Sequence, residues 1–215
     1  MPILPPGYDG RRAACAYAAP VESPGFPRLT GTAAVSVRPA RAADAAEMAR
    51  VQAVTWRTAY RSVLPAAVLD EWDEAGAAEV WRAAVVTPPT PAHGLLVAVD
   101  GEAVVGFAAY GPPEVSPQQP RAADGPTTEV AALLVEPRWG RRGHGSRLLA
   151  AVADLAAATG ATRLAMWVPE PDQVTARFLE SAGWAPDGWA RTLDTGAEPL
   201  RELHWHAELQ EEGAP

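Results

Sequence analysis

The fold is decided by one continuous stretch, Thr127 to Thr159, which reads TTEVAALLVEP over 127–137, RWGRRGHGS over 138–146 and RLLAAVADLAAAT over 147–159. The first part is an apolar run typical of a strand, and the last is an alanine-rich run typical of a helix. Gly143 and Gly145 in the turn between them allow positive φ and let a ligand approach the backbone closely. We therefore predict a strand, a tight turn and a helix whose first amides face the turn.

The turn is also the most basic part of an acidic chain. Although the net charge of the whole chain is -8, four arginines fall within ten residues here: Arg138, Arg141, Arg142 and Arg147. The N-terminus of a helix presents unpaired N–H groups and about half a positive charge. Together these features predict an anion site, and the geometry suits a phosphate or a pyrophosphate.

Composition limits the classes of protein that need to be considered. With 215 residues, 48% of them hydrophobic, the chain is long enough for one well-packed domain and a tail. It has neither an apolar run long enough to span a membrane nor the pattern of a secretory signal, and its single cysteine, Cys15, excludes an internal disulfide. We therefore expect a cytoplasmic protein. The acidic charge argues against nucleic-acid binding and mildly favours cationic substrates such as amines.

Turn and proline signals divide the chain into a loosely attached tail (1–33), a domain (34–209) and a short C-terminal tail (210–215). The domain should begin with a strand over 34–38, followed by a helix that opens with a capping box of Asp44 and Glu47. A second helical region should cover 66–86, with a break near Gly76. A hairpin should follow, with strands over 95–99 and 103–110 around Asp100-Gly101.

After the featured helix, Gly160 is predicted as its C′ residue. We expect a buried strand over 163–168, a short helix capped by Asp172 and ending near Gly183, and two last strands over 184–193 and 200–209. In the last strand Leu203, Trp205, Ala207 and Leu209 alternate with His204, His206 and Glu208, so one face should be core and the other solvent. The strand-helix-strand step over 127–168 implies a parallel pair, and the hairpins imply antiparallel pairs. The fold class is α/β with a mixed sheet.

These residues resemble the GNAT superfamily of N-acetyltransferases, whose hallmark is a strand, a [Q/R]-x-x-G-x-[G/A] turn and a helix. The turn here is Gly140-Arg141-Arg142-Gly143-His144-Gly145. The likeness extends to Trp56-Arg57-Thr58-Ala59-Tyr60 with Leu64-Pro65, and to RFLESAGW over 177–184, which is similar to the family's R-F-Y-E-x-x-G-F. The resemblance covers about residues 34–209. It implies a GNAT-like fold, with a central, mixed, mostly antiparallel sheet of about seven strands flanked by about four helices.

The resemblance also implies a reaction. It suggests direct transfer of an acetyl group from acetyl-CoA, as co-substrate and without a metal, to a primary amine of an unidentified small molecule or peptide. In the family the pyrophosphate sits on the turn, here Arg141, Arg142, Gly143, His144, Gly145 and Ser146. The pantothenate arm pairs with the backbone of the preceding strand, here Leu133, Leu134 and Val135. Many members dimerise, so a homodimer is compatible with the resemblance.

Glu129 is the candidate catalytic base. Strand alternation would put its side chain on the face shared by Ala131 and Leu133. Several family members place a glutamate at this position to deprotonate the incoming ammonium, usually through water, because a protonated amine has no lone pair to attack a thioester. The alternative is that Glu129 is an ordinary solvated carboxylate at the end of a strand.

Two departures from the family pattern leave a second function open. Gly140 stands where the family has Gln or Arg, and Leu179 stands where many members carry a tyrosine that protonates the leaving thiolate. Tyr110 is the nearest substitute acid by sequence. A catalytically idle acyl-CoA-binding or regulatory module therefore remains an alternative. Nucleotide binding is disfavoured, since the chain has no Gly-Lys-Ser/Thr motif.

Other side chains allow two interpretations each. His144 could contact phosphate or point to solvent. His204 and His206 share a strand face, but no cluster of further ligands accompanies them, so metal binding is not expected. Trp56, Trp72 and Trp81 lie on the helices that line the acceptor site in relatives, and such tryptophans are more often part of the core.

Overall fold

The computed structural model describes residues 35–61, 66–113, 125–194 and 199–209. The tails expected at residues 1–33 and 210–215 lie outside the described residues, as do Cys15 and Leu64-Pro65.

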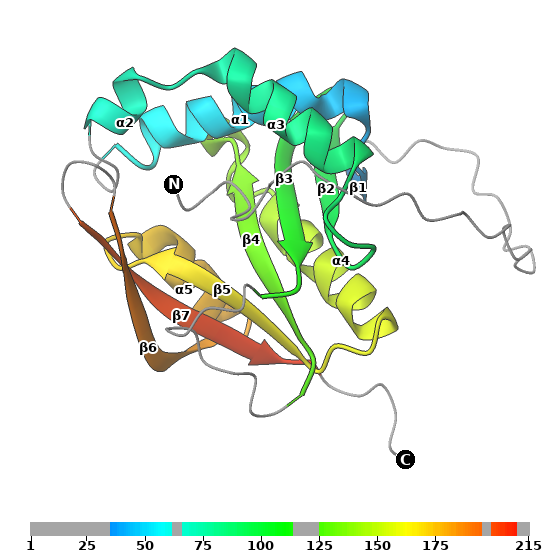
Figure 1. Ribbon diagram of the computed structural model, residues 1–215, viewed down its shortest axis with the longest axis vertical. Coiled ribbons are helices and arrows are strands. Elements are labelled where there is room, and N and C mark those ends of the chain that lie inside the picture. The colour runs from blue at the N-terminus through cyan, green and yellow to red at the C-terminus, as the bar shows by residue number, and fades with distance from the viewer. Residues whose placement is uncertain (1–34, 62–65, 114–124, 195–198, 210–215) are drawn as a thin grey trace, which may run out of the picture.

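One sheet organises the described part of the chain (Figure 1). Its order is β1-β2-β3-β4-β5-β7-β6, and every neighbouring pair is antiparallel except β4 and β5. The expected mixed, mostly antiparallel sheet is therefore confirmed. The strands are β1 (Val35–Pro39), β2 (Gly94–Asp100), β3 (Ala103–Gly111), β4 (Thr127–Val135), β5 (Arg163–Pro169), β6 (Ala185–Leu193) and β7 (Leu200–Glu208).

Helices cover both faces of the sheet. On one face α1 (Ala45–Thr58) and α3 (Glu74–Val86) pack against β2, β3 and β4, with the short α2 (Ala66–Asp70) between them in the chain. On the other face lie α4 (His144–Ala158) and α5 (Gln173–Ser181) (Figure 1). Two core clusters result. Trp56, Trp81 and Phe107 belong to the first, and Leu148, Leu179 and Trp205 to the second.

An irregularity in β4 changes which side chains share a face. Ala109 of β3 pairs with Ala132, but the next residue, Tyr110, pairs with Val130, so Ala131 is an extra residue in β4. Such a β-bulge breaks the alternation of side chains. Val130 accordingly packs on the side of α4, whereas Ala132 packs on the side of α1 and α3.

This bulge overturns one expectation about Glu129. Leu133 packs against the cluster under α4, whereas Glu129 lines a pocket together with Trp81 of α3. The two side chains are therefore on opposite faces of the sheet, because the period of two assumed for the strand is interrupted at Ala131.

Strands β4 and β5 are paired over only a short length. The registered pairs run from Thr127↔Arg163 to Glu129↔Ala165, and beyond them the strands diverge like the arms of a V (Figure 1). The second half of β4, after Glu129, therefore has no strand partner in the register on the edge that faces β5. Backbone N–H and C=O groups on such an edge can pair with an extended ligand.

Three local predictions need correction. The break in the second helical region lies at residues 71–73, and Gly76 is inside α3, because the amide of Ala77 donates to the carbonyl of Asp73 and so begins the helix. The capping box of Asp44 and Glu47 does not form. Instead Asp44 accepts from the Arg41 amide and pairs with Arg38, and Glu47 pairs with Arg50.

The third correction concerns β7. Its expected solvent face is covered only in part. His204 is 7% exposed and Glu202 only 2% exposed, whereas His206 is half-buried and Glu208 is exposed as expected. The physical reason is a polar network on this face. His204 Nδ1 lies 2.6 Å from Asp187 Oδ2, and Arg191 Nε donates to Glu202 Oε2 at 2.6 Å. Alternation in the sequence located the face correctly, but neighbouring side chains decided its burial.

Other local predictions are confirmed. Gly101 in the hairpin has φ +60, and Gly160 after α4 has φ +84, as a C′ glycine requires. Asp172 caps α5 by accepting from the amide of Thr175 at 3.0 Å. Trp56 and Trp81 are buried in the core, as expected for tryptophans on these helices.

Candidate active site

A large cleft opens where β4 and β5 diverge. Its volume is about 600 Å³, and its walls come from the end of β4, the turn before α4, the end of α1 and the start of α5. The sequence-predicted residues Leu133, Leu134, Val135, Arg141, Gly143, His144, Gly145 and Ser146 all line it. Segments far apart in the chain are thus brought together around one elongated space.

The turn at one end of the cleft has the conformation that its glycines allow. Gly143 is the N-cap of α4 with φ 79 and ψ 7, and its carbonyl accepts from the Arg147 amide at 3.0 Å. The amides of the first turn of α4 have no intrahelical partner, and they face the cleft. The N-terminal end of α4 that borders the cleft is positively polarised. Arg141 also has a positive φ of 58, an unfavourable conformation for a residue with a Cβ.

The side chains of the four arginines in this turn make different contacts. Arg141 lines the cleft. Arg142 does not line it. Its guanidinium lies 4.8 Å from the ring centroid of Trp139, a cation–π contact. Arg138 pairs with buried Glu136 at 2.5 Å, and Arg147 donates to the carbonyl of Arg142 at 3.0 Å.

The structure excludes one of the two environments considered for His144 from the sequence. Its side chain is 1% exposed, so it does not point to solvent. Nε2 lies 3.4 Å from Asp100 Oδ2, and the ring packs edge-on against Trp139. The ring therefore lies between the start of α4 and the β2–β3 hairpin, and the residue lines the cleft.

Four buried polar atoms belong to residues that line this cleft and have no hydrogen-bond partner among the described residues. They are Thr55 Oγ1 on α1, Trp139 Nε1 in the turn, and Nδ1 and Nε2 of His144. Leaving a buried polar atom unpaired costs about 1–3 kcal/mol, so native proteins usually satisfy such atoms. Their presence fits a ligand with its own polar groups, as the arm and phosphates of coenzyme A have.

A smaller cavity continues the cleft between the diverging strands. Tyr60, Leu134 and Asp172 line both spaces, and the smaller one extends to Trp167 of β5 and Glu202 of β7. Burial raises the pKa of the Glu202 carboxyl, and the nearby Arg191 partly offsets that rise. Neither Trp167 nor Glu202 was singled out from the sequence, because their positions depend on how β5 pairs with β7.

Tyr60 and Thr175 are the hydroxyl-bearing residues that line both spaces, and Tyr60 carries the phenol. Tyr60 is 8% exposed and lies close to Asp172 and Thr175. Burial raises the pKa of this hydroxyl above its ordinary range, and the charge of Asp172 raises it further. The family's tyrosine position and the substitute considered from sequence lie elsewhere. Leu179 is fully buried in the core, and Tyr110 lines a different pocket. Tyr60 stands in the quoted Trp56–Tyr60 segment, which was the one signal that could have indicated it.

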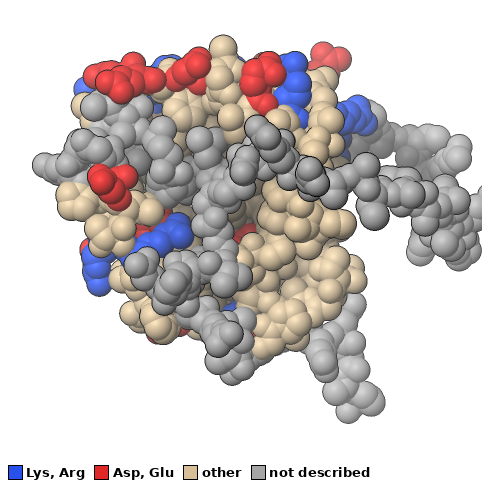
Figure 2. All heavy atoms as spheres, viewed as in Figure 1, with Lys and Arg blue, Asp and Glu red and all other residues tan. Residues whose placement is uncertain are grey.

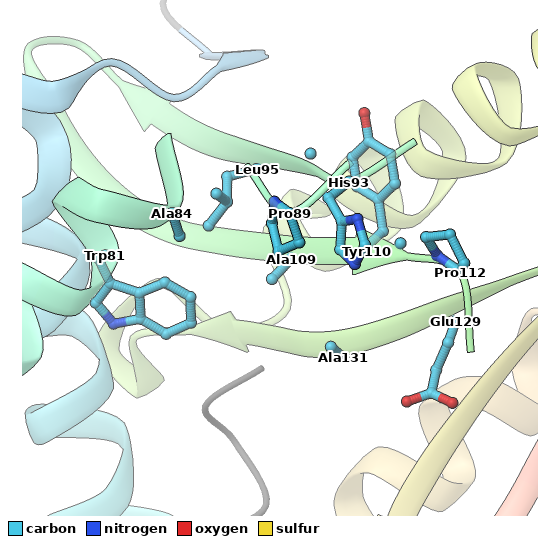
Figure 3. Close-up of a pocket in the computed structure, with 12 residues that line it drawn as sticks. Trp81, Ala84, Pro89, His93, Leu95, Ala109, Tyr110, Pro112, Glu129 and Ala131 are labelled. Carbon is cyan, nitrogen blue, oxygen red and sulfur yellow. The ribbon is translucent and has the colours of Figure 1, made fainter. Parts of the chain in front are cut away.

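Glu129 borders a third space, an apolar pocket under α3 (Figure 3). Only 8% of the residue is exposed, so it is not the solvated strand-end carboxylate that sequence left open. Ala131 at the bulge lines both this pocket and the cavity between the strands. Glu129 therefore lies beside the point where the spaces meet.

The described residues contain neither a candidate metal site nor a candidate membrane span. No three His, Cys, Asp or Glu side chains come close enough there to hold a metal ion. Within the same residues, none of the helices combines the length and the apolar character needed to cross a membrane.

Comparison with known proteins identifies the family. The family model described as "Acetyltransferase (GNAT) family" matches residues 52–184, which is more than half of the chain. The chain belongs to this family of acetyltransferases. A curated relative, the uncharacterized N-acetyltransferase YuaI of Bacillus subtilis (strain 168), is 28% identical over 137 residues, covering 63% of this chain and 72% of the relative.

Solved structures share the GNAT fold. YncA from Salmonella typhimurium, solved with its cofactor acetyl-CoA, superimposes with a TM-score of 0.60 at 19% identity, covering 85% of this chain and 98% of that one. The PaiA N-acetyltransferase from Thermoplasma acidophilum, solved with coenzyme A, gives a TM-score of 0.62 at 14% identity, covering 81% and 98%. At these identities the likeness establishes the fold of this GNAT protein and leaves its acceptor undetermined.

Proposed function

We propose that this protein transfers an acetyl group from acetyl-CoA directly to a primary amine. The observation that carries the proposal is the continuity of the three spaces. The cleft at the Gly143 turn meets the cavity between β4 and β5 at Tyr60, and that cavity meets the pocket of Glu129 at Ala131. The presence of acetyl-CoA and coenzyme A in the two structural relatives supports the identity of the donor.

The residues of the cleft suit the parts of acetyl-CoA. The amides of Gly143, His144, Gly145 and Ser146 would hold the diphosphate at the helix N-terminus. The free edge of β4 at Leu133, Leu134 and Val135 would pair with the amides of the pantetheine arm. Thr55 Oγ1 and Trp139 Nε1 offer two more hydrogen bonds. When bound, acetyl-CoA supplies an acetyl group activated as a thioester.

Glu129 is assigned the role of the base. An alkylammonium must lose a proton before its nitrogen can attack, and a largely buried carboxylate beside the acceptor can remove it directly or through water. General-base assistance of this kind is worth roughly 10²–10⁴-fold in rate. The same negative charge also favours binding of the ammonium form.

Tyr60 is assigned the role of a hydrogen-bond donor to the leaving sulfur. A thiol has a pKa of about 8.5, whereas the raised pKa of Tyr60 keeps its hydroxyl protonated throughout the working range. Full proton transfer from Tyr60 to the thiolate would therefore be uphill. A hydrogen bond to the thiolate is favourable, and it replaces the contribution that Leu179 cannot make.

The surface charge is suited to a cationic acceptor. Acidic side chains gather along the top of the view in Figure 2, over α2 and α3, and the exposed ones there include Asp70, Glu71, Asp73, Glu74 and Glu79. A concentration of one sign of charge raises the encounter rate with ligands of the opposite sign, more strongly at low salt.

Calorimetry with acetyl-CoA, together with a free-thiol release assay over a panel of amines, tests the proposal. We expect binding and amine-dependent thiol release. Binding without release on any amine would instead support the idle acyl-CoA-binding module, and no uptake at millimolar acetyl-CoA would overturn the assignment altogether.

Replacing Glu129 tests the assigned base. Glu129→Gln should lower kcat by about 10²-fold or more at neutral pH and leave acetyl-CoA affinity nearly unchanged. The deficit should shrink at alkaline pH, as more of the amine is already neutral. Glu102→Gln, an exposed change in the β2–β3 turn, is the matched control. A Glu129→Gln enzyme as active as wild type from mildly acidic to mildly basic pH would remove Glu129 from the mechanism.

A further inference from the structure

Glu202 lies on the face of β7 that borders the cavity between β4 and β5. Leu203 and Trp205 of the same strand pack in the core under α4, so strand alternation puts Glu202 on the opposite face. Glu202 is 2% exposed, and it lines the cavity together with Tyr60 and Asp172. The cavity has a volume of about 20 Å³, so it admits a water molecule or a single amino group.

Glu202 also has an oxygen atom available to a ligand in this cavity. Among the described residues that line the cavity, the titratable side chains are those of Tyr60, Asp172 and Glu202. Both oxygens of Asp172 accept hydrogen bonds from Thr175, at 3.0 Å and 2.6 Å. Glu202 Oε2 accepts from Arg191 Nε at 2.6 Å, whereas Oε1 accepts no hydrogen bond from a described residue. Of the two buried carboxylates, Glu202 therefore has the greater capacity to receive a proton.

Neighbouring side chains hold the Glu202 carboxylate in place. The guanidinium of Arg191, which binds Oε2, also lies over the ring of Trp167, at 4.4 Å from the ring centroid. His204 packs against the same ring, with the centroids 4.7 Å apart, and its Nδ1 lies 2.6 Å from Asp187 Oδ2. Because Arg191 has a second favourable contact with Trp167, its position does not depend on the charge of Glu202 alone.

The surroundings of Glu202 suit the transfer of a proton in both directions. Burial raises the pKa of its carboxyl, with Arg191 partly offsetting the rise, and a carboxylate with a raised pKa is a stronger base than an exposed one. The ordinary pKa values of a glutamic acid and a thiol are about 4.3 and 8.5. This wide margin means that a protonated Glu202 can still give its proton to a thiolate.

We propose that Glu202 carries a proton from the acceptor nitrogen to the leaving sulfur. This inference rests on the proposed acetyl transfer, and it supplies the acid that Leu179 cannot provide and that Tyr60 provides only as a hydrogen-bond donor. The Glu202 side chain lies in the cavity that adjoins the cleft, with Tyr60 lining both spaces. The reacting nitrogen and sulfur would both lie at this junction, within reach of one carboxylate directly or through a water molecule.

The proton and electron balance assigns separate steps to the two glutamates. Glu129 removes the first proton from the alkylammonium, and the neutral nitrogen then forms a bond to the thioester carbon. Glu202 Oε1 takes the second proton from that nitrogen, which carries a positive charge once the bond has formed. As the carbonyl group re-forms, the C–S bond breaks and its electron pair stays on sulfur. Glu202 then gives its proton to the sulfur and becomes a carboxylate again. The net products are an amide, a thiol and one proton released to solvent.

Glu202→Gln tests the proposed proton carrier. Glutamine keeps the shape of the side chain and an oxygen for Arg191, but it cannot take a proton. With acetyl-CoA and the most active amine of the panel, kcat should fall about 10²-fold, while acetyl-CoA affinity measured by calorimetry stays within about twofold of wild type.

Glu208→Gln is the matched control. Glu208 is on the same strand and also pairs with an arginine, at 2.6 Å from Arg163, but it is exposed. This variant should keep the wild-type kcat. Thermal denaturation checks that both proteins are folded. A Glu202→Gln protein with wild-type kcat would overturn the inference.

Chemical rescue distinguishes proton transfer from a purely structural role. Glu202→Ala leaves space beside Arg191 for a small carboxylate, so added formate should raise the low kcat of this variant at least about 10-fold. Formate should not raise the kcat of Glu202→Gln, where the glutamine side chain fills the same space. A folded Glu202→Ala protein whose low kcat does not respond to formate would count against the proton carrier.

The wild-type assay separates this inference from the proposed function. If wild type releases thiol in the presence of an amine and Glu202→Gln does so equally well, acetyl transfer stands and the proton carrier fails. If wild type releases no thiol with any amine, the proposed function fails, and the role of Glu202 fails with it.

Discussion

Tyr60 at the end of α1 and Asp172 at the start of α5 lie together at the boundary between the large cleft and the cavity that leads to the acceptor side, where the charge of Asp172 helps to raise the pKa of the Tyr60 phenol. Asp172 is at the same time the N-cap of α5, since its Oδ1 accepts from the Thr175 amide at 3.0 Å and its Oδ2 accepts from Thr175 Oγ1 at 2.6 Å. The same carboxylate therefore caps a helix and lies beside the phenol that we assign to the leaving sulfur.

Tyr60→Phe removes this hydroxyl while keeping the ring. We expect kcat to fall about 10-fold, equivalent to the loss of one hydrogen bond of about 1.4 kcal/mol, with acetyl-CoA affinity within about twofold of wild type. Steady-state kinetics and calorimetry measure the two effects. Ser181→Ala deletes an exposed hydroxyl of α5 and is the control. A Tyr60→Phe enzyme with wild-type kcat would show that the sulfur leaves without help from this residue.

Gly145→Ala separates folding from cofactor binding. Gly145 lies in the first turn of α4, where a Cβ would meet Phe178 at 3.5 Å, an ordinary contact distance. Alanine favours helix over glycine by about 1 kcal/mol, so Tm should hold or rise. The added methyl group lies next to residues of the cleft wall, so acetyl-CoA affinity should fall about 10-fold or more. Unchanged affinity would indicate that the diphosphate binds elsewhere.

Arg141 can be tested with two substitutions. Its φ of 58 suits glycine, so Arg141→Gly should raise the free energy of unfolding by about 1 kcal/mol, whereas Arg141→Ala should not. If backbone amides provide most of the binding energy for the diphosphate, the affinity for acetyl-CoA should fall only a few-fold, and by the same factor in both variants. Urea unfolding measures the free energy of unfolding, and calorimetry measures the affinity for acetyl-CoA. Equal stability of the two variants would mean that the positive φ carries no strain.

Asp44 makes stability depend on pH. Its pKa is held below the ordinary value, first by the hydrogen bond from Arg38 and also by the Arg41 amide, against the opposing effect of burial. A lowered folded-state pKa stabilises the fold above the unfolded-state value, and this stability is lost as pH falls through the folded-state value.

Asp44→Asn should therefore lower the free energy of unfolding by about 1–2 kcal/mol at pH 7. The difference from wild type should begin to shrink below about pH 4 and disappear once Asp44 itself is protonated. Urea unfolding across this range measures it, with the exposed Asp154→Asn as control. A difference that stays constant down to acidic pH would show that the Arg38 pair is not its source.

Local signals in the sequence predicted most elements because each depends on residues close together in the chain. Asp100-Gly101 indicated the hairpin, Asp172 the start of α5, and Gly143 the left-handed turn before α4. The mismatch at Gly76 has a physical explanation as well. A glycine weakens a helix by only about 1 kcal/mol, which tertiary packing easily offsets, and the backbone bond at Asp73 set the start of α3.

Such local signals did not predict which side chains are buried or which distant residues contact one another. Periodicity places a side chain on a face, but it does not say what covers that face, so the burial of Glu202 and His204 was missed. In the same way, a run of four arginines indicated positive charge but not that Arg142 would stack on Trp139.

By itself the sequence determined the strand, turn and helix around Gly143 and the order of elements that places this chain among the GNAT acetyltransferases. These depend on backbone conformations and apolar patterns that a short segment specifies. Only the tertiary structure decided where Glu129 points and which hydroxyl lies at the junction of the spaces. One extra residue at Ala131 reverses the faces of β4, and Tyr60 meets Asp172 from a distant part of the chain, because long-range strand pairing, which no local pattern encodes, fixes both.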